Sequence, residues 1–167
     1  VEIMVPLIAI EKELEAILEA IVEEIGKSPI PIPLGTMIET PRAALIAGEL
    51  APHVNFVSFG TNDLTQMTFG FSRDDVEATV INEYIKKGIL EESPFSALDQ
   101  IGVGELIKTA IEKSKEANPS IKIGICGEHG GDPKSIRFLS DIGVDYVSCS
   151  PPRLPIARLV GAQQSIL

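Results

Sequence analysis

Three small polar residues interrupt an apolar stretch in the segment VSFGTNDLTQ, residues 57–66. Thr61, Asn62 and Asp63 directly follow a strand-like run, and Glu39 closes an earlier one, LGTMIE. Because the carboxyl ends of parallel strands meet at one rim of a sheet, the Glu39 and Asp63 carboxylates are expected to face the same mouth. Mg²⁺ is commonly held by one or two carboxylates together with water and substrate oxygens. The pair therefore suggests a magnesium site.

Each acid also has a purely structural interpretation. Glu39 can be a solvated carboxylate near the N-terminus of the next helix, where the helix dipole favours it. Asp63 can be an ordinary acid of a first helical turn, with Asn62 as the N-cap. The turn Gly60–Thr61–Asn62–Asp63 also offers free backbone N–H groups at a helix entrance, which accept a carboxylate or a phosphate. Such turns are common, so this turn predicts an anion pocket only together with the carboxylate pair.

The two cysteines and one histidine are further candidates for chemistry. Cys126 ends the apolar run IKIGIC and is followed at once by GEHGGDP, so its thiol is expected at the rim, where it can exchange a proton with a substrate. A buried structural cysteine is the alternative. Cys149, in YVSCSP, can be the same kind of rim thiol, and position alone does not choose between them. His129 is either a metal ligand, a phosphate carrier or a loop histidine held by hydrogen bonds.

The rest of the chain explains how these residues are brought together. Apolar strand-like runs alternate with amphipathic helical segments, which predicts a parallel α/β sheet. Five βα units are too few to close an eight-stranded barrel. Thr40 is expected to cap a helix that has Pro41 at its first position. Strands are predicted at 1–8, 34–39, 54–60, 121–126 and 145–150, helices at 10–26, 40–51, 62–71, 81–90, 104–118, 133–143 and 151–167, and a rigid connector at 28–33.

Composition narrows the classes of function. The chain of 167 residues suits one domain, residues 1–167, and carries a formal net charge of -10. This charge argues against binding to nucleic acid or to an anionic membrane surface, because phosphate recognition needs clustered Lys and Arg. No apolar run reaches the roughly 18 residues of a spanning helix. Two cysteines do not make a disulfide framework, which favours a reducing, cytoplasmic setting.

Four motifs carry a resemblance to a known family. GTMIETPRAAL, FVSFGTNDLTQMTFGFSRDD, GICGEHGGDPKS and DYVSCSPPRLPIARL resemble the C-terminal phosphoenolpyruvate/pyruvate-binding barrel of the pyruvate, phosphate dikinase family. The likeness covers essentially the whole chain. It implies part of a (β/α)₈ barrel, from about the fourth strand to the eighth. The related phosphoenolpyruvate synthases share the Thr-Asn-Asp or Ser-Asn-Asp turn, but MTFGFSRDD and CGEHGGDP are closer to the dikinases.

The resemblance also implies roles for the candidate residues. Glu39 and Asp63 match the family's Mg²⁺ ligands, and the turn Gly60–Thr61–Asn62–Asp63 matches the segment that binds pyruvate or phosphoenolpyruvate. Cys126 matches the general acid/base that exchanges a proton at C3, which selects it over Cys149. His129 does not match the phosphohistidine of the family, which lies in a separate upstream domain.

The partners implied by the resemblance are the phosphohistidine and nucleotide-binding domains of a full-length enzyme. The resemblance also implies a homodimer. The implied location is the cytoplasm, or the plastid of a plant. The family's substrate-binding arginines lie on earlier barrel strands, and nothing assigns their role to Arg42 or Arg153. The chain alone is therefore expected to be inactive. Two alternatives are an inactive binding or dimerisation module and a flavodoxin-like small-ligand protein. The second fits the number of strands but does not explain the motifs.

Overall fold

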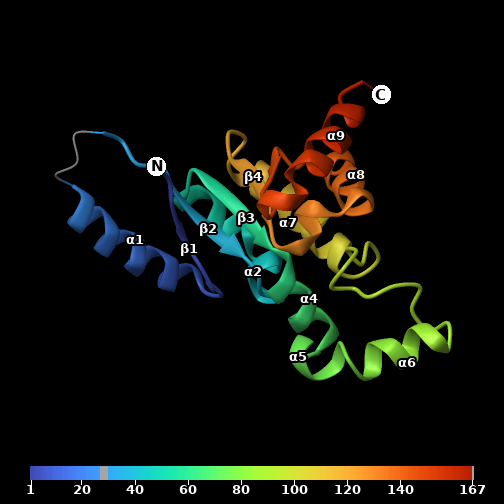
Figure 1. Cartoon of the computed structure of the whole chain (residues 1–167). Coiled ribbons are helices and arrows are strands. Elements are labelled where there is room, and N and C mark those ends of the chain that lie inside the picture. The colour runs from blue at the N-terminus through green and yellow to red at the C-terminus, as the bar shows by residue number, and fades with distance from the viewer. Residues whose placement is uncertain (27–29, 167) are drawn as a thin grey trace.

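The computed structural model describes residues 1–26 and 30–166, so the connector predicted at 28–33 lies partly outside the described residues. Its centre is a parallel sheet with helices packed along it, and α5 and α6 extend away from the sheet (Figure 1). The strands are β1 (Ile3–Val5), β2 (Leu34–Ile38), β3 (Phe56–Gly60), β4 (Lys122–Cys126) and β5 (Tyr146–Val147). Each lies within a segment that the sequence predicts as a strand. No helix among the described residues is long and apolar enough to cross a membrane.

The strands follow one another in space as they do in sequence. Their order is β1-β2-β3-β4-β5, and each pair of neighbours is parallel. Right-handed crossovers between strands in this order place every connecting helix on the same face. A doubly wound sheet of the flavodoxin type reverses its strand order at a switch point. The five described strands show no such reversal, so they form an arc of consecutive βα units, as in part of a (β/α)₈ barrel.

The helices confirm most of the predicted segments. One difference concerns residues 40–51, which form two short helices and a 3₁₀ turn instead of one helix, because the backbone leaves the helical region at Ile46. The break re-aims the second helix so that Gly48 lies close to the backbone of Lys113 in α7. The helices are α1 (Glu11–Ile25), α2 (Pro41–Leu45), α3 (Ala47–Leu50), α4 (Thr61–Phe69), α5 (Arg73–Val76), α6 (Val80–Lys86), α7 (Val103–Ala117), α8 (Pro133–Asp141) and α9 (Leu154–Gln164), with 3₁₀ turns η1 (Ala51–His53), η2 (Glu128–Gly131) and η3 (Pro151–Arg153).

Two predicted caps have different outcomes. Thr40 caps α2 as expected, because its side chain accepts a hydrogen bond from the Ala43 N–H at 3.0 Å. Asn62 is not the N-cap of α4. The cap position is Gly60, and Thr61 is already the first helical residue. The helix begins this early because the strand runs directly into it, which leaves the Asn62 side chain available for a contact outside the helix.

The two faces of the sheet differ in composition. The face toward the helices contributes Val57, Phe59, Ile123 and Ile125 to the main core, where Ile107 of α7 also lies. The opposite face corresponds to the interior of a barrel and combines glycines with aromatic rings. An added Cβ at Gly35 would lie 2.4 Å from the Phe56 ring, and one at Gly124 would lie 2.1 Å from the Tyr146 ring. The glycines therefore make room for rings that lie across neighbouring strands.

Candidate active site

The predicted site residues meet at the carboxyl ends of β2, β3 and β4. Glu39 is the residue after β2, and Gly60 and Cys126, which end β3 and β4, are register partners. A Cβ at Gly60 would lie 2.5 Å from Glu39 Oε2, so only glycine lets this carboxylate rest against the end of β3. The rim predicted from the strand ends is thus confirmed as a place where Glu39, the Thr61–Asp63 turn and Cys126 come together.

Glu39 is a buried carboxylate held from a third strand. It is 3% exposed, and its Oε1 accepts a hydrogen bond of 2.7 Å from the backbone N–H of Leu7, just beyond β1. Leu7 has a φ of 54°, a left-handed conformation that is uncommon for a side chain of this kind. Strained backbone of this type is concentrated at functional sites. Because only 3% of Glu39 is exposed, its interpretation as a solvated surface acid is wrong.

The two carboxylates at the rim repel each other. Burial raises the pKa of Glu39, and the nearby charge of Asp63 and a hydrogen bond with its side chain raise it further, while the Leu7 N–H lowers it. Asp63 Oδ1 accepts a hydrogen bond of 3.0 Å from Gln66 Nε2. Within the described part of the chain, the ion pairs of Lys, Arg and His involve other acids. A buried acid beside a second acid, with no cationic side chain, fits a site for a bound cation.

The Thr61–Asn62 turn is fixed by contacts with the loop after β4. Asn62 Oδ1 accepts a hydrogen bond of 3.2 Å from the Glu128 N–H, which leaves the amide NH₂ group available to donate. Gly127 has a φ of 112°, and a Cβ there would lie 2.6 Å from Thr61 Oγ1. The first N–H groups of α4 have no partner within the helix. Backbone and side-chain donors thus converge at the entrance of a nine-residue helix.

His129 stabilises the Thr61–Asn62 turn by a hydrogen bond from the protein interior. The side chain is completely buried, with Nδ1 2.8 Å from Thr61 Oγ1 and Nε2 2.9 Å from the Pro94 carbonyl oxygen. Burial lowers the pKa of His129, so the neutral ring is favoured. A neutral ring that donates from Nε2 to Pro94 accepts at Nδ1 from the Thr61 hydroxyl, which shares its single proton with the Cys126 carbonyl oxygen 3.1 Å from Oγ1. Of the three interpretations of His129, the structure supports the loop histidine held by hydrogen bonds.

Cys126 lies within the electrostatic influence of both acids. Burial raises the pKa of its thiol, and the charges of Glu39 and Asp63 raise it further, so the thiol keeps its proton. The side chain of Ser58 on β3 partly offsets this rise, and the thiol donates a hydrogen bond of 3.4 Å to the Phe59 carbonyl oxygen. Ser58 also lowers the pKa of the Tyr146 phenol, which burial raises. Ser58 thus affects both the thiol and the ring that lies against Gly124.

Cys149 and the two arginines have different surroundings. Cys149 packs against the small core between α8 and α9 and lines a hollow of about 230 Å³ together with Gly127 and Arg153. Arg42 donates a hydrogen bond to the Ala9 carbonyl oxygen, which ties α2 to the start of α1. Neither this bond nor the hollow involves the Glu39 and Asp63 carboxylates.

Comparison with known proteins gives these residues a family context. The family described as PEP-utilising enzyme, PEP-binding domain, matches residues 1–166. The chain belongs to this family. Its curated relatives include pyruvate, phosphate dikinases of Mesembryanthemum crystallinum and Arabidopsis thaliana, both 56% identical and both named as chloroplastic, and one of Zea mays, 54% identical. Each is matched over 97% of this chain, which spans only 17% to 19% of the relative's length.

A solved structure supports the fold of this phosphoenolpyruvate-binding domain. A citrate lyase from Burkholderia xenovorans superimposes with a TM-score of 0.60 at 18% sequence identity. The superposition covers 99% of this chain and 54% of the citrate lyase chain. The likeness concerns the fold alone, and it agrees with a parallel α/β sheet that forms part of a barrel.

Several residues of the phosphoenolpyruvate-binding domain were not singled out from the sequence. Leu7 gave no signal, because its contact with Glu39 depends on an unusual backbone angle. Ser58 and Tyr146 look like ordinary strand residues. The useful signal was Gly124 in the run IKIGIC, since a glycine inside a strand marks the close approach of another group. That group is the Tyr146 ring.

Proposed function

We propose that the chain is the pyruvate/phosphoenolpyruvate half-site of a dikinase, which interconverts ATP, phosphate and pyruvate with AMP, diphosphate and phosphoenolpyruvate through a phosphohistidine. The observation that carries this proposal is the pair of uncompensated carboxylates, Glu39 and Asp63, beside the protonated thiol of Cys126. The names of the curated relatives favour a dikinase over a phosphoenolpyruvate synthase.

Glu39 and Asp63 would hold Mg²⁺. A bound Mg²⁺ supplies a Lewis acid that polarises the keto oxygen of pyruvate and stabilises negative charge on it. The protein's own contribution is to keep the two acids together: the Leu7 N–H fixes one oxygen of Glu39, and Gly60 leaves space for the other. The Gln66 amide orients Asp63 in the same way.

The Thr61–Asn62 turn would orient the substrate carboxylate. The free N–H groups of the first turn of α4 and the Asn62 NH₂ group can donate to it. Because His129 and the Glu128 N–H fix the turn before substrate binds, these donors require little rearrangement.

Cys126 would transfer the proton at C3 of the substrate. In the direction of pyruvate formation, the thiol gives its proton to C3 of the enolate, which becomes the methyl group, and the sulfur is left as a thiolate. In the opposite direction, the thiolate removes a methyl proton. The raised pKa of Cys126 favours the protonated form needed for the first direction. The Phe59 carbonyl oxygen accepts a hydrogen bond from the thiol and would help to orient it.

The remaining parts of the reaction belong to other domains. The phosphoryl group would arrive on a histidine of a separate domain, itself charged by a nucleotide-binding domain, and the intact enzyme would be a homodimer. The short span of the relatives that this chain covers supports such additional domains. The location would be the cytoplasm, or the plastid as in the named plant relatives.

Calorimetric titration with oxalate, a mimic of the enolate, tests the proposal. Oxalate should bind in the presence of Mg²⁺ and not in its absence, and Glu39→Gln should abolish the binding. Glu49→Gln, at an exposed position on α3, removes the same charge away from the rim and should have no effect. Binding that ignores Mg²⁺, or that Glu39→Gln leaves intact, would contradict the assignment. Absence of binding by a folded chain would favour a structural or dimerisation module.

A further inference from the structure

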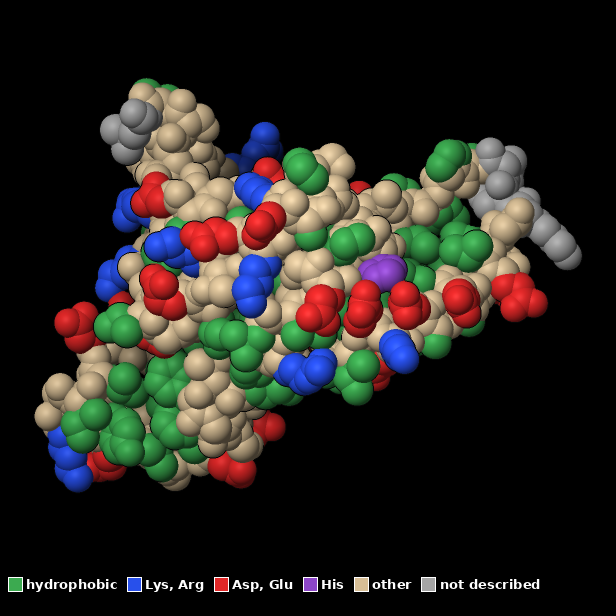
Figure 2. All heavy atoms as spheres, turned by 180° about the vertical axis from the view of Figure 1, so that it is seen from behind, with side chains coloured by type: hydrophobic (Ala, Val, Ile, Leu, Met, Phe, Trp, Pro, Cys, Tyr) green, Lys and Arg blue, Asp and Glu red, His purple; other side chains and the backbone are tan. Residues whose placement is uncertain are grey.

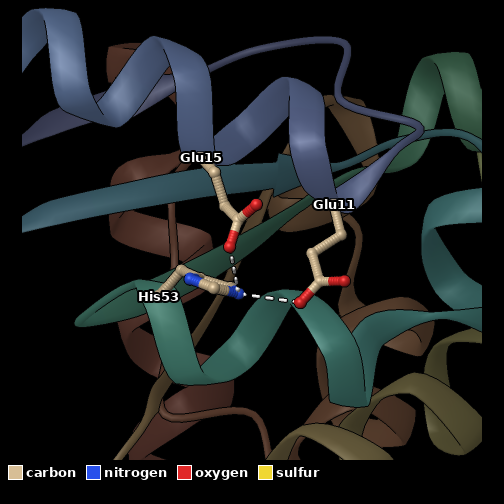
Figure 3. A group of neighbouring side chains, drawn as sticks. All are labelled: Glu11, Glu15 and His53. Atoms are coloured by element: carbon tan, nitrogen blue, oxygen red, sulfur yellow. Dashed lines mark hydrogen bonds and ion pairs between the residues drawn. The ribbon is translucent and has the colours of Figure 1, made fainter.

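A second group of ligating side chains, separate from the Glu39 and Asp63 pair, lies between α1 and η1. Glu11 and Glu15 come from α1, and His53 comes from η1 (Figure 3). His53 Nε2 is 2.9 Å from Glu11 Oε1 and 3.8 Å from Glu15 Oε1. The three ligand atoms all lie within 4.8 Å of one another. Figure 3 shows both carboxylates directed toward the same edge of the imidazole ring.

The arrangement depends on the helical spacing of the two glutamates and on the packing of η1 against α1. Glu11 and Glu15 are four residues apart, so they lie one above the other on a single face of α1. Leu14 and Leu18, which are buried, anchor the helix to the core and turn this acidic face toward η1. His53 ends the 3₁₀ turn that follows the break at Ile46. The cluster thus depends on two segments that are distant in sequence.

The chemistry of the three atoms fits a borderline transition metal. Zn²⁺ takes imidazole nitrogen and carboxylate oxygen at roughly 2.0–2.2 Å, usually in a tetrahedron, which places its ligand atoms about 3.3 Å apart. The separations of 2.9 and 3.8 Å lie on either side of this value. Mg²⁺ prefers oxygen ligands and octahedral geometry, so it is a poor match for a site with a histidine. A fourth position would be left for water.

The surroundings add negative charge and open space. Figure 2 shows a histidine beside a row of acidic side chains. Glu19, one turn further along α1, lines a hollow of about 320 Å³ together with Glu15 and His53. With a neutral imidazole, the three ligands carry two negative charges and no positive one. A hydrogen-bonded histidine–glutamate pair would need only one carboxylate, whereas here two converge on one ring nitrogen.

We propose that Glu11, Glu15 and His53 form a binding site for Zn²⁺ or a similar divalent transition metal, which fastens α1 to η1. The site shares no residue with the proposed phosphoenolpyruvate site, because its three ligands come from α1 and η1. A bridge between α1 and η1 would add stability where α1 is incompletely covered. Ile17 and Val22 leave part of the apolar surface of α1 exposed, so this helix gains less from packing than a fully covered helix would. A metal bridge would oppose its detachment.

Titration of the chain with Zn²⁺ tests the proposal. Cys126→Ser, Cys149→Ser and Glu39→Gln, made together, provide a background without the thiols and without the rim acid, which could bind Zn²⁺ on their own. In this background, calorimetry should detect one equivalent of Zn²⁺. The ring-nitrogen NMR signals of one of the two histidines should shift on binding. Those of the other, His129, should stay unchanged, because both of its ring nitrogens are already engaged.

Matched variants locate the ion. His53→Gln and Glu15→Gln should each weaken Zn²⁺ binding by at least about tenfold and remove the rise in melting temperature that Zn²⁺ causes. Glu19→Gln removes an equal charge from the same helix face and should change the affinity less than about twofold, since only long-range charge is lost. Binding that survives His53→Gln, or an equal loss in Glu19→Gln, would overturn the site. So would the absence of any shift in the histidine signals.

Discussion

Replacing Gly124 with alanine should force the Tyr146 ring away from the inner face of the sheet. The new Cβ would lie 2.1 Å from Cζ and 2.4 Å from the phenol oxygen, whereas non-bonded carbon atoms pack at roughly 3.5–4.0 Å. The ring has to move by more than 1 Å. It then loses its contact with Lys122, whose Nζ lies 4.7 Å from the ring centroid.

The cost can be estimated from these losses. Overpacking typically costs about 1–3 kcal/mol, and the lost cation–π contact accounts for about 0.5–1 kcal/mol of such a change. Tyr146 is only half-buried in the outermost strand, so the ring can swing out and the total should stay within that range. For a domain of this size, the melting temperature should fall by about 2–4 °C for each kcal/mol.

Two comparisons separate the clash from a general effect of alanine. Gly161 lies in α9, and a Cβ there meets no atom within 4 Å. Gly161→Ala should therefore raise stability by about 0.5–1 kcal/mol, as expected for a helical glycine. Adding Tyr146→Ala to Gly124→Ala removes the ring that the Cβ strikes. The free-energy change of the double variant should be clearly smaller than the sum of the single changes. Additive effects in thermal unfolding would refute the proposed packing.

Three further predictions concern titration and buried polarity. The folded chain holds the Glu39 proton more tightly than the unfolded chain, because the pKa of Glu39 is raised on folding. The free energy of unfolding should therefore fall as pH rises through the ordinary glutamate range toward the raised pKa. In denaturant titrations without metal, Glu39→Gln should flatten this slope. In a Cys149→Ser background, alkylation of Cys126 should reach half its maximal rate at a higher pH than alkylation of an ordinary thiol does. Glu39→Gln should lower that midpoint pH, and an unchanged midpoint would contradict the charge coupling. Thr61→Val leaves buried His129 without its partner at Nδ1 and should cost about 1–3 kcal/mol in chemical denaturation, and a cost near zero would refute the assigned bond.

The general architecture was predictable because it depends on local patterns. Aliphatic runs such as IKIGIC mark buried parallel strands, and strand ends share a rim in any parallel sheet. Glu39 and Asp63 could therefore be assigned to one mouth from their positions alone. The pair needed no knowledge of loop geometry, since each acid follows its strand within a few residues.

The parts that could not be predicted depend on contacts across the fold. The bond from Leu7 to Glu39 requires a left-handed backbone, which the side chain of Leu7 does not announce. The position of Asn62 before an apolar run is typical of a helix cap, but the helix begins at Thr61 and the Asn62 side chain reaches the loop after β4 instead. Along the sequence, β2, α2 and α3 lie between the acidic face of α1 and His53. Only the tertiary packing of η1 brings the ring to that face.

The order of the strands has a consequence for assembly of the chain. The connection from Gly60 to Lys122 is about twice as long as the one from Val5 to Leu34, and each doubling of a loop adds about 0.6 kcal/mol of closure entropy. The segments that carry Glu39 and Asp63 are joined by a short connection, so they can meet early. Cys126 joins them only after the longest loop of the sheet has closed. The part of the rim that carries the two carboxylates can thus form before the part that carries the thiol, and Cys126 joins the rim last.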